Sequence, residues 1–182
     1  MFYDICHWKN RRSGNKLYSM NADPFLTLAF FAGLTDSQRK VLRPAFELVE
    51  FDESVVIFEQ GALAEHLHIV VEGEVLVMFK PDDGPHLPVT RVRPGGVVGW
   101  SAAVGSRRYT SAAITTQKTY LLRASGNELR MLFRQHPDIG TIMKERLANV
   151  IAERARSTHA KVMNLLDVGF SLQEETQEAK PV

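Results

Sequence analysis

The stretch Val56-Ile-Phe-Glu-Gln-Gly61, followed by Ala64-Glu-His-Leu-His-Ile-Val-Val-Glu-Gly73 and Glu74-Val-Leu-Val-Met-Phe79, decides the fold of this sequence. It holds three short apolar runs rich in β-branched and aromatic residues, which favour strands. The second and third runs flank Glu72-Gly73-Glu74, where glycine permits a tight bend. The stretch therefore predicts three successive strands with a bend between the last two.

Short apolar runs recur on both sides of this stretch, from Glu47 to Arg123. Pro81-Asp-Asp-Gly84 is a strong turn signal inside the same region. We expect eight strands, at residues 48–51, 55–58, 67–71, 75–79, 89–93, 97–98, 112–114 and 119–122. Because no helix-length segment separates them, a parallel sheet with helical crossovers is excluded, and a sandwich, jelly roll or small barrel remains.

Helical patterns precede and follow the strands. Residues 24–46 predict two small helices, the second opened by a capping box at Thr35-Asp-Ser-Gln38. A second capping box, Ser125-Gly-Asn-Glu128, opens a short helix through Gln135, which Pro137 ends.

A longer helix is predicted next, capped by Asp138 and running to about Leu166, with an apolar or small residue every three or four positions. About 28 residues at a rise of about 1.5 Å span roughly 42 Å, which is longer than one small β domain can cover. The helix of residues 138–166 therefore predicts a homodimer; the alternative is a bent helix folded back on its own domain.

This order of elements, together with Gly61 and Gly73, resembles the cyclic nucleotide-binding domain family, that of catabolite-activator-like jelly-roll sensors. The resemblance covers roughly residues 25–160. It implies a mainly β fold with flanking helices (α+β): an eight-stranded jelly roll, or double-stranded β-helix, with N-terminal helices and a long C-terminal helix. We expect a domain over residues 20–167, made of helices at 24–46, the roll at 47–123 and helices at 125–167.

The resemblance places a phosphate-binding cassette late in the roll, at Gly99 to Ser111. In the family, a glutamate after the glycine accepts a hydrogen bond from the ribose hydroxyl, and a later arginine pairs with the cyclic phosphate. This sequence has Trp100 and Thr110 at those two positions. Loss of a charge-assisted contact of this kind lowers affinity on the order of a hundredfold.

Other groups in the cassette offer compensation. Arg107 or Arg108 can supply a cation if the loop shifts register, and backbone N–H groups of residues 101–103 are expected to face an anion. Trp100 and Tyr109 either stack on a base or fill the pocket. The candidate ligand-binding residues are Gly99, Trp100, Ser101, Ala102, Arg107, Arg108, Tyr109, Thr110 and Ser111.

A metal site is a weaker alternative. His66, His68 and Glu72 share one strand face if the alternation is regular, and this spacing resembles the first motif of the cupins, which also form jelly rolls. The departures are a glycine-to-histidine spacing one residue short, Phe79 at the motif's closing glycine, and Gly99 where a further histidine would stand.

Composition sets the remaining limits. The chain has 182 residues, a net charge of +1 and one cysteine, which argue against an electrostatic preference for nucleic acid and against a disulfide framework. No apolar run reaches the roughly 20 residues of a membrane span, and the basic start lacks a signal peptide's apolar stretch, so we expect a cytoplasmic protein. Residues 1–19 predict a flexible basic leader and residues 168–182 a disordered tail.

These observations predict a stand-alone regulatory or sensor module rather than an enzyme. It would bind a small anionic ligand, cAMP or cGMP among the candidates, need no cofactor, and signal through its C-terminal helix to an unidentified protein partner. The alternative is a degenerate roll that binds no cyclic nucleotide and serves in dimerisation or protein interaction. Only sixteen residues follow Leu166, so no helix-turn-helix and no DNA binding of that kind are expected.

Overall fold

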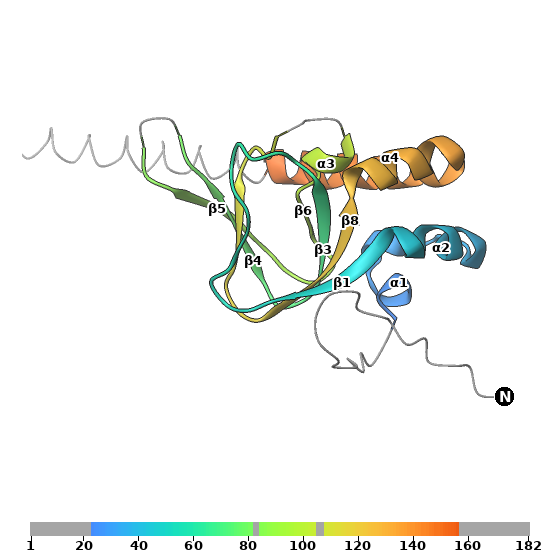
Figure 1. Cartoon of the computed structure of the whole chain (residues 1–182), viewed down its shortest axis with the longest axis horizontal. Helices are drawn as coiled ribbons and strands as arrows, with labels where there is room; N and C mark the ends of the chain where they lie inside the picture. The colour runs from blue at the N-terminus through green and yellow to red at the C-terminus, as the bar shows by residue number, and fades with distance from the viewer. Residues whose placement is uncertain (1–22, 82–83, 105–107, 157–182) are drawn as a thin grey trace, which may run out of the picture. The chain divides into compact units, whose positions relative to one another are not determined.

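The computed structural model describes residues 23–81, 84–104 and 108–156 (Figure 1). The predicted leader, the predicted tail and the last part of the predicted long helix lie outside the described residues. The elements, in chain order, are α1 (Pro24–Thr27), η1 (Ala29–Phe31), α2 (Asp36–Leu42), η2 (Arg43–Ala45), β1 (Phe46–Phe51), β2 (Val56–Phe58), β3 (His66–Glu72), β4 (Val75–Phe79), β5 (Leu87–Val92), β6 (Val97–Val98), α3 (Ser101–Val104), β7 (Ala112–Thr115), β8 (Thr119–Ser125) and α4 (Gly126–Gln135). A further helix covers residues 137–156.

The eight strands form two four-stranded antiparallel sheets, with the orders β1-β8-β3-β6 and β2-β7-β4-β5. Their inner faces share one apolar core drawn from both sheets: Val70, Val75, Val77, Val92, Val98, Ala113 and Leu121. Every predicted strand is present, so the predicted eight-stranded jelly roll with flanking helices is confirmed.

The outer face of the first sheet packs against the N-terminal helices. Phe46, at the start of β1, makes edge-to-face contacts with Phe25 and Phe31, whose rings stack at 4.2 Å. The predicted capping box of α2 is confirmed, because the Thr35 hydroxyl accepts from the Gln38 N–H and the Gln38 side chain accepts from the Thr35 N–H. The aromatic contacts fix α1 and η1 on the sheet.

The second predicted capping box is wrong. Ser125 precedes α4, but its side chain makes no capping hydrogen bond. The reason is tertiary: Ser125 is still paired with His66 in the sheet, and the next N–H, from Gly126, donates to the Glu65 carbonyl at 2.8 Å. The pairing of β8 with β3 thus takes over the role expected of the hydroxyl.

The next helix begins at Pro137, one residue before the predicted cap. Proline suits a first helical position because its missing N–H has no intrahelical partner there. Asp138 therefore lies in the first turn, where its carboxylate accepts a hydrogen bond from Gln38 Nε2 at 2.9 Å. Residues up to Glu145 belong to one compact unit, and those from Arg146 to a second, of which helical residues 146–156 are described.

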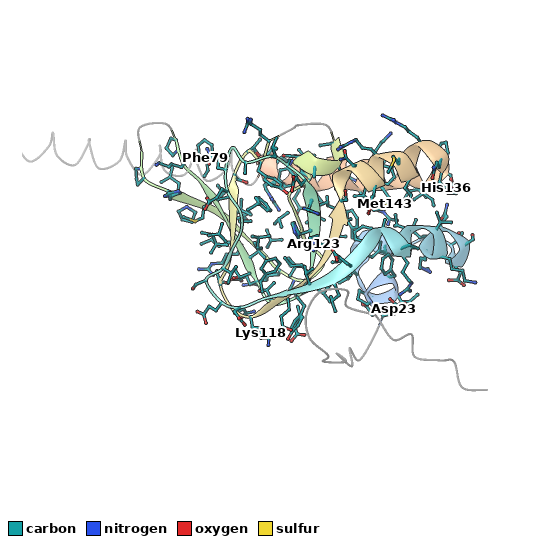
Figure 2. All side chains as sticks on the ribbon, viewed as in Figure 1. Asp23, Phe79, Lys118, Arg123, His136 and Met143 are labelled. Atoms are coloured by element: carbon teal, nitrogen blue, oxygen red, sulfur yellow. The ribbon has the colours of Figure 1, made fainter. Side chains whose placement is uncertain are left out.

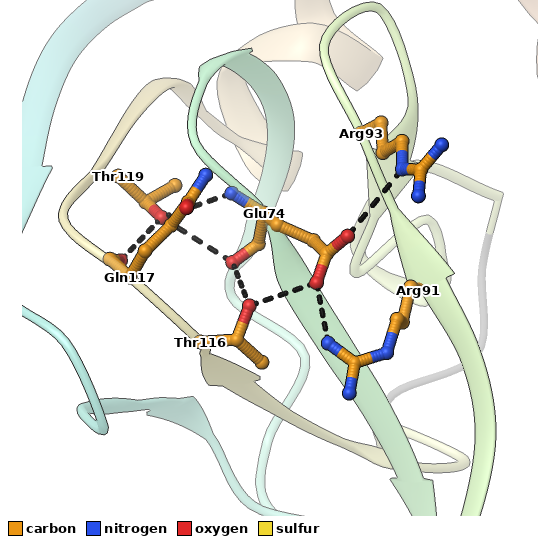
Figure 3. Close-up of polar contacts among 6 residues, drawn as sticks. All are labelled: Glu74, Arg91, Arg93, Thr116, Gln117 and Thr119. Carbon is orange, nitrogen blue, oxygen red and sulfur yellow. Dashed lines mark hydrogen bonds and ion pairs between the residues drawn. The ribbon is translucent and has the colours of Figure 1, made fainter.

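Figure 3 shows the contacts that hold the bend between β3 and β4. Gly73 has φ +94°, and a Cβ there would lie 2.5 Å from Thr119 Oγ1, so the bend requires glycine. The Glu74 carboxylate accepts from Arg91 Nη1 at 2.5 Å and from Thr116 Oγ1 at 3.0 Å. Because the hydrogen bond from Arg91 stabilises the anion most, the pKa of Glu74 is lowered.

Among the described residues, no helix has both the length and the apolar character that a membrane crossing requires.

Candidate ligand site

The predicted cassette begins where the backbone passes closest to β3. Gly99 follows β6 with φ +72°, and a Cβ at this position would lie 2.7 Å from the His66 carbonyl oxygen. The same Cβ would lie 3.2 Å from the Tyr109 ring and 3.3 Å from the Phe58 ring. Only glycine fits this close approach in this conformation.

The helical turn α3 then follows, with Ser101 and Ala102 buried and Trp100 half-buried. The Ala102 N–H donates to the Gly99 carbonyl at 3.1 Å, and the Ala103 N–H donates to the Trp100 carbonyl at 2.9 Å. Two of the three N–H groups expected to face an anion are therefore used inside the turn. The acceptors are the carbonyls of the two residues that precede α3, so each N–H group closes a tight bond to the residue three positions earlier.

Tyr109 is the main anchor of the cassette. Its buried ring stacks on Phe58 with centroids 3.9 Å apart. Its hydroxyl donates to the His66 carbonyl at 2.9 Å and lies 3.0 Å from the His66 N–H, from which it accepts. The ring is buried inside the roll, and burial raises the pKa of its phenol.

The described basic residue of the cassette, Arg108, lies at the surface. The exposed Arg108 donates from Nη1 to the Gly61 carbonyl at 2.6 Å and bridges to Leu63. Thr110 is exposed and Ser111 is half-buried. Arg107 lies outside the described residues. In this structure, then, the guanidinium of Arg108 is turned to a loop carbonyl.

A polar row that sequence reasoning missed crosses the neighbouring sheet. Glu47 of β1 is directly opposite Arg123 of β8, and Arg123 is directly opposite His68 of β3. Glu47 Oε1 accepts from Arg123 Nε at 2.7 Å and lies 2.6 Å from Arg123 Nη2. Glu47 and Arg123 are 76 positions apart in the chain, and His68 and Arg123 are 55 apart. The sequence alone does not predict this row, because the pairing register of distant strands is a tertiary property.

His68 lies at the inner end of that row. Its side chain is only 3% exposed, and its Nδ1 has no hydrogen-bond partner in the part of the chain that the structure describes. Burial, with smaller contributions from His66 and Arg123, lowers the pKa of His68 to about 3. The imidazole is therefore neutral at physiological pH.

The predicted metal face is wrong at Glu72. Regular alternation would keep it beside His66 and His68, but the register shifts between Val70 and Glu72, so Glu72 pairs with Tyr120 and leaves that face. The two imidazole centroids are 6.2 Å apart. Within the described ranges, no cluster of three or more histidine, cysteine or acidic side chains is arranged to hold a metal ion.

Comparison with known proteins finds a matching family profile and a matching relative. Residues 48–136 match the sequence profile described as "Cyclic nucleotide-binding domain". The chain is 24% identical over 136 residues to a CRP-like cAMP-activated global transcriptional regulator of Mycobacterium tuberculosis. That alignment covers 75% of this chain and 59% of the regulator, so the chain spans about three fifths of that relative's length.

Two solved structures extend the comparison. A putative cyclic nucleotide-binding protein of Geobacter metallireducens has 27% identity and a TM-score of 0.62, covering 70% of this chain and 92% of its own. A regulatory subunit of a cAMP-independent protein kinase A from Trypanosoma brucei has 19% identity and a TM-score of 0.59, covering 76% of this chain and 47% of its own. It is a mutant bound to cAMP in which a glutamate, a threonine and a valine are replaced by alanine, arginine and alanine.

Proposed function

We propose that this chain, which matches the cyclic nucleotide-binding domain family over residues 48–136, is a regulatory module that binds a small anionic ligand at the cassette of residues 99–111. The observation that carries the proposal is the anchoring of the cassette on β3. Gly99 approaches the His66 carbonyl too closely for any side chain, and the Tyr109 hydroxyl bonds the same residue. These contacts fix the loop at Gly99 and at Tyr109, which preorganises those two positions for binding.

The ligand of this module is not held by the family's pair of charged side chains. Trp100 stands where the family has glutamate, and the exposed Thr110 stands where it has arginine. We propose that cAMP and cGMP bind the wild-type chain weakly for this reason. The signal would pass through the helix that begins at residue 137, in a cytoplasmic homodimer formed by residues 138–166.

Restoring the missing cation tests the proposal. Thr110→Arg should raise the affinity for cAMP or cGMP by about tenfold to a hundredfold, because a charge-assisted contact to phosphate contributes about 1.5–3 kcal/mol. A threonine-to-arginine change is among the substitutions in the cAMP-bound trypanosome protein, which motivates this choice. Thr141→Arg adds the same charge at an exposed position of the last helix and should change nothing.

Isothermal titration calorimetry of the full chain with each cyclic nucleotide measures the effect. Absence of binding by both the wild type and Thr110→Arg at millimolar nucleotide would overturn the proposal.

A second candidate is a roll that binds no small ligand and serves in protein interaction. The stack of Tyr109 on Phe58 favours it, because these rings occupy the space directly beside Gly99. Phe58→Ala separates the two candidates and leaves the Tyr109 hydroxyl on His66: removing this ring should improve nucleotide binding if it blocks a site, and should leave binding absent if no site exists. Light scattering of the same samples reports the oligomeric state.

A further inference from the structure

The polar row of Glu47, Arg123 and His68 faces the interior of the roll. Residues directly opposite each other in antiparallel strands point to the same side of the sheet. Leu121 is two residues from Arg123, and Val70 is two residues from His68, so each shares a sheet face with its neighbour in the row. Both Leu121 and Val70 lie in the apolar core between the sheets. The row, which includes the Arg123 labelled in Figure 2, therefore continues the inner face of the roll with polar groups.

The row has hydrogen-bonding capacity that residues 23–81, 84–104 and 108–156 do not use. Arg123 contacts one oxygen of Glu47 through Nε and Nη2, whereas a guanidinium has five N–H donors in total. The side chains of Arg123 and Glu47 are 30% and 40% exposed, so a small molecule can reach them. The buried His68 Nδ1 without a partner is a second, independent sign, because such atoms are rare in native structures.

The row also lies at the cassette end of the roll. His68 is directly opposite Val98, which immediately precedes Gly99. The His68 ring lies 6.0 Å from the ring of Phe58, on which Tyr109 of the cassette stacks. The cassette and the row are therefore connected through the ring of Phe58.

The chemistry of the row matches what the cassette lacks. Trp100 and Thr110 remove one carboxylate and one guanidinium, and the row holds one of each. A carboxylate accepts a hydrogen bond from a hydroxyl, whereas guanidinium and imidazole N–H groups donate to an anionic oxygen. Because Glu47 already balances the charge of Arg123, the row suits an anion that also carries a hydroxyl better than a bare anion.

We propose that Glu47, Arg123 and His68 form the recognition centre of the anionic ligand, and that this ligand is a small hydroxylated anion such as a sugar phosphate or a sugar acid. Arg123 and the His68 Nδ1–H donate to the phosphate or carboxylate oxygen, and Glu47 accepts from a hydroxyl of the same molecule. This inference rests on the proposed function, since it names the ligand class of the same site.

The experiment uses the full chain and three probes: ribose 5-phosphate, 2-deoxyribose 5-phosphate, and gluconate as the carboxylate arm. Calorimetry gives affinities, and imidazole NMR signals report directly on His68. Ribose 5-phosphate or gluconate should shift the His68 signals saturably, and Arg123→Gln should weaken that binding by at least about tenfold. Whichever of the two binds more tightly identifies the source of the anionic oxygen.

Two variants serve as controls. Arg91→Gln removes another arginine paired with a glutamate, at the opposite end of the roll, and should bind like the wild type. Glu47→Gln should reduce the preference for ribose 5-phosphate over its 2-deoxy form. If Arg123→Gln alone does not fold, the double variant Glu47→Gln/Arg123→Gln keeps a hydrogen-bonded row without charges and should also bind weakly.

Equal binding by Arg123→Gln and Arg91→Gln, or His68 signals that do not move, would overturn this inference. If Thr110→Arg still gains cyclic nucleotide affinity in that case, the proposed function stands and only the recognition centre is wrong. If no probe binds and Thr110→Arg gains nothing, both fail.

Discussion

Acidification below about pH 6.5 should destabilise this protein through His68. The imidazole is buried inside the roll, with His66 and the Arg123–Glu47 pair as its titratable and charged neighbours. Its pKa is about 3 in the folded chain, against an ordinary value of 6.5. The unfolded chain therefore takes up a proton first as the pH falls.

The size of the effect follows from that difference. Stability contributed by the neutral imidazole is fully present above pH 6.5 and is lost progressively as the pH falls toward 3. One pKa unit corresponds to about 1.4 kcal/mol, so the loss between pH 7.5 and pH 5 is about 2 kcal/mol. Burial also lowers the pKa of His66, which adds a loss of the same sign.

Urea unfolding at pH 7.5, 6 and 5 measures this loss directly. His68→Phe removes the titrating group. The loss of unfolding free energy between pH 7.5 and pH 5 should therefore be about 2 kcal/mol smaller in this variant than in the wild type, whatever the variant's stability at pH 7.5. His86→Gln, which removes an exposed histidine, should leave the dependence unchanged. Carboxylates with lowered pKa values, such as Glu74, lose their contribution only below about pH 4.5 and stay outside this window.

The reasoning would be refuted by identical pH dependence in the wild type and His68→Phe. An NMR titration showing that His68 protonates near pH 6.5 in the folded chain would refute it equally.

Two further comparisons test the local geometry. Gly73→Ala should destabilise the fold by about 3 kcal/mol or more, because the added Cβ would lie 2.5 Å from Thr119 Oγ1 at a residue with positive φ. Gly61 also has positive φ but has open space around it, so Gly61→Ala should cost about 1 kcal/mol. Thermal or urea unfolding of both variants measures this, and similar losses would contradict the role of the contact. Thr35→Ala should cost about 1 kcal/mol through its lost cap, while Ser125→Ala should cost less than about 0.5 kcal/mol because its hydroxyl makes no capping bond. A larger loss for Ser125→Ala in the same unfolding assay would contradict the observed start of α4.

The cassette shows which features of the candidate site could be predicted from the sequence. Its position followed from the resemblance, and its two replaced side chains could be read directly as Trp100 and Thr110. What the cassette does in three dimensions could not be read: the N–H groups of Ala102 and Ala103 are used within the turn, and Tyr109 fills the interior. Hydrogen bonds made by a single turn depend on where the chain goes next, which residue type alone does not decide.

By itself, the sequence determined the eight strands, the glycine bend at Gly73 and the cap at Thr35. Each of these depends on neighbours within a few positions, where side-chain type and backbone preference act directly. Only the tertiary structure decided the register between distant strands, and with it the Glu47–Arg123–His68 row. A one-residue bulge moved Glu72 off the histidine face, because pairing, rather than local preference, sets which residues meet across a sheet.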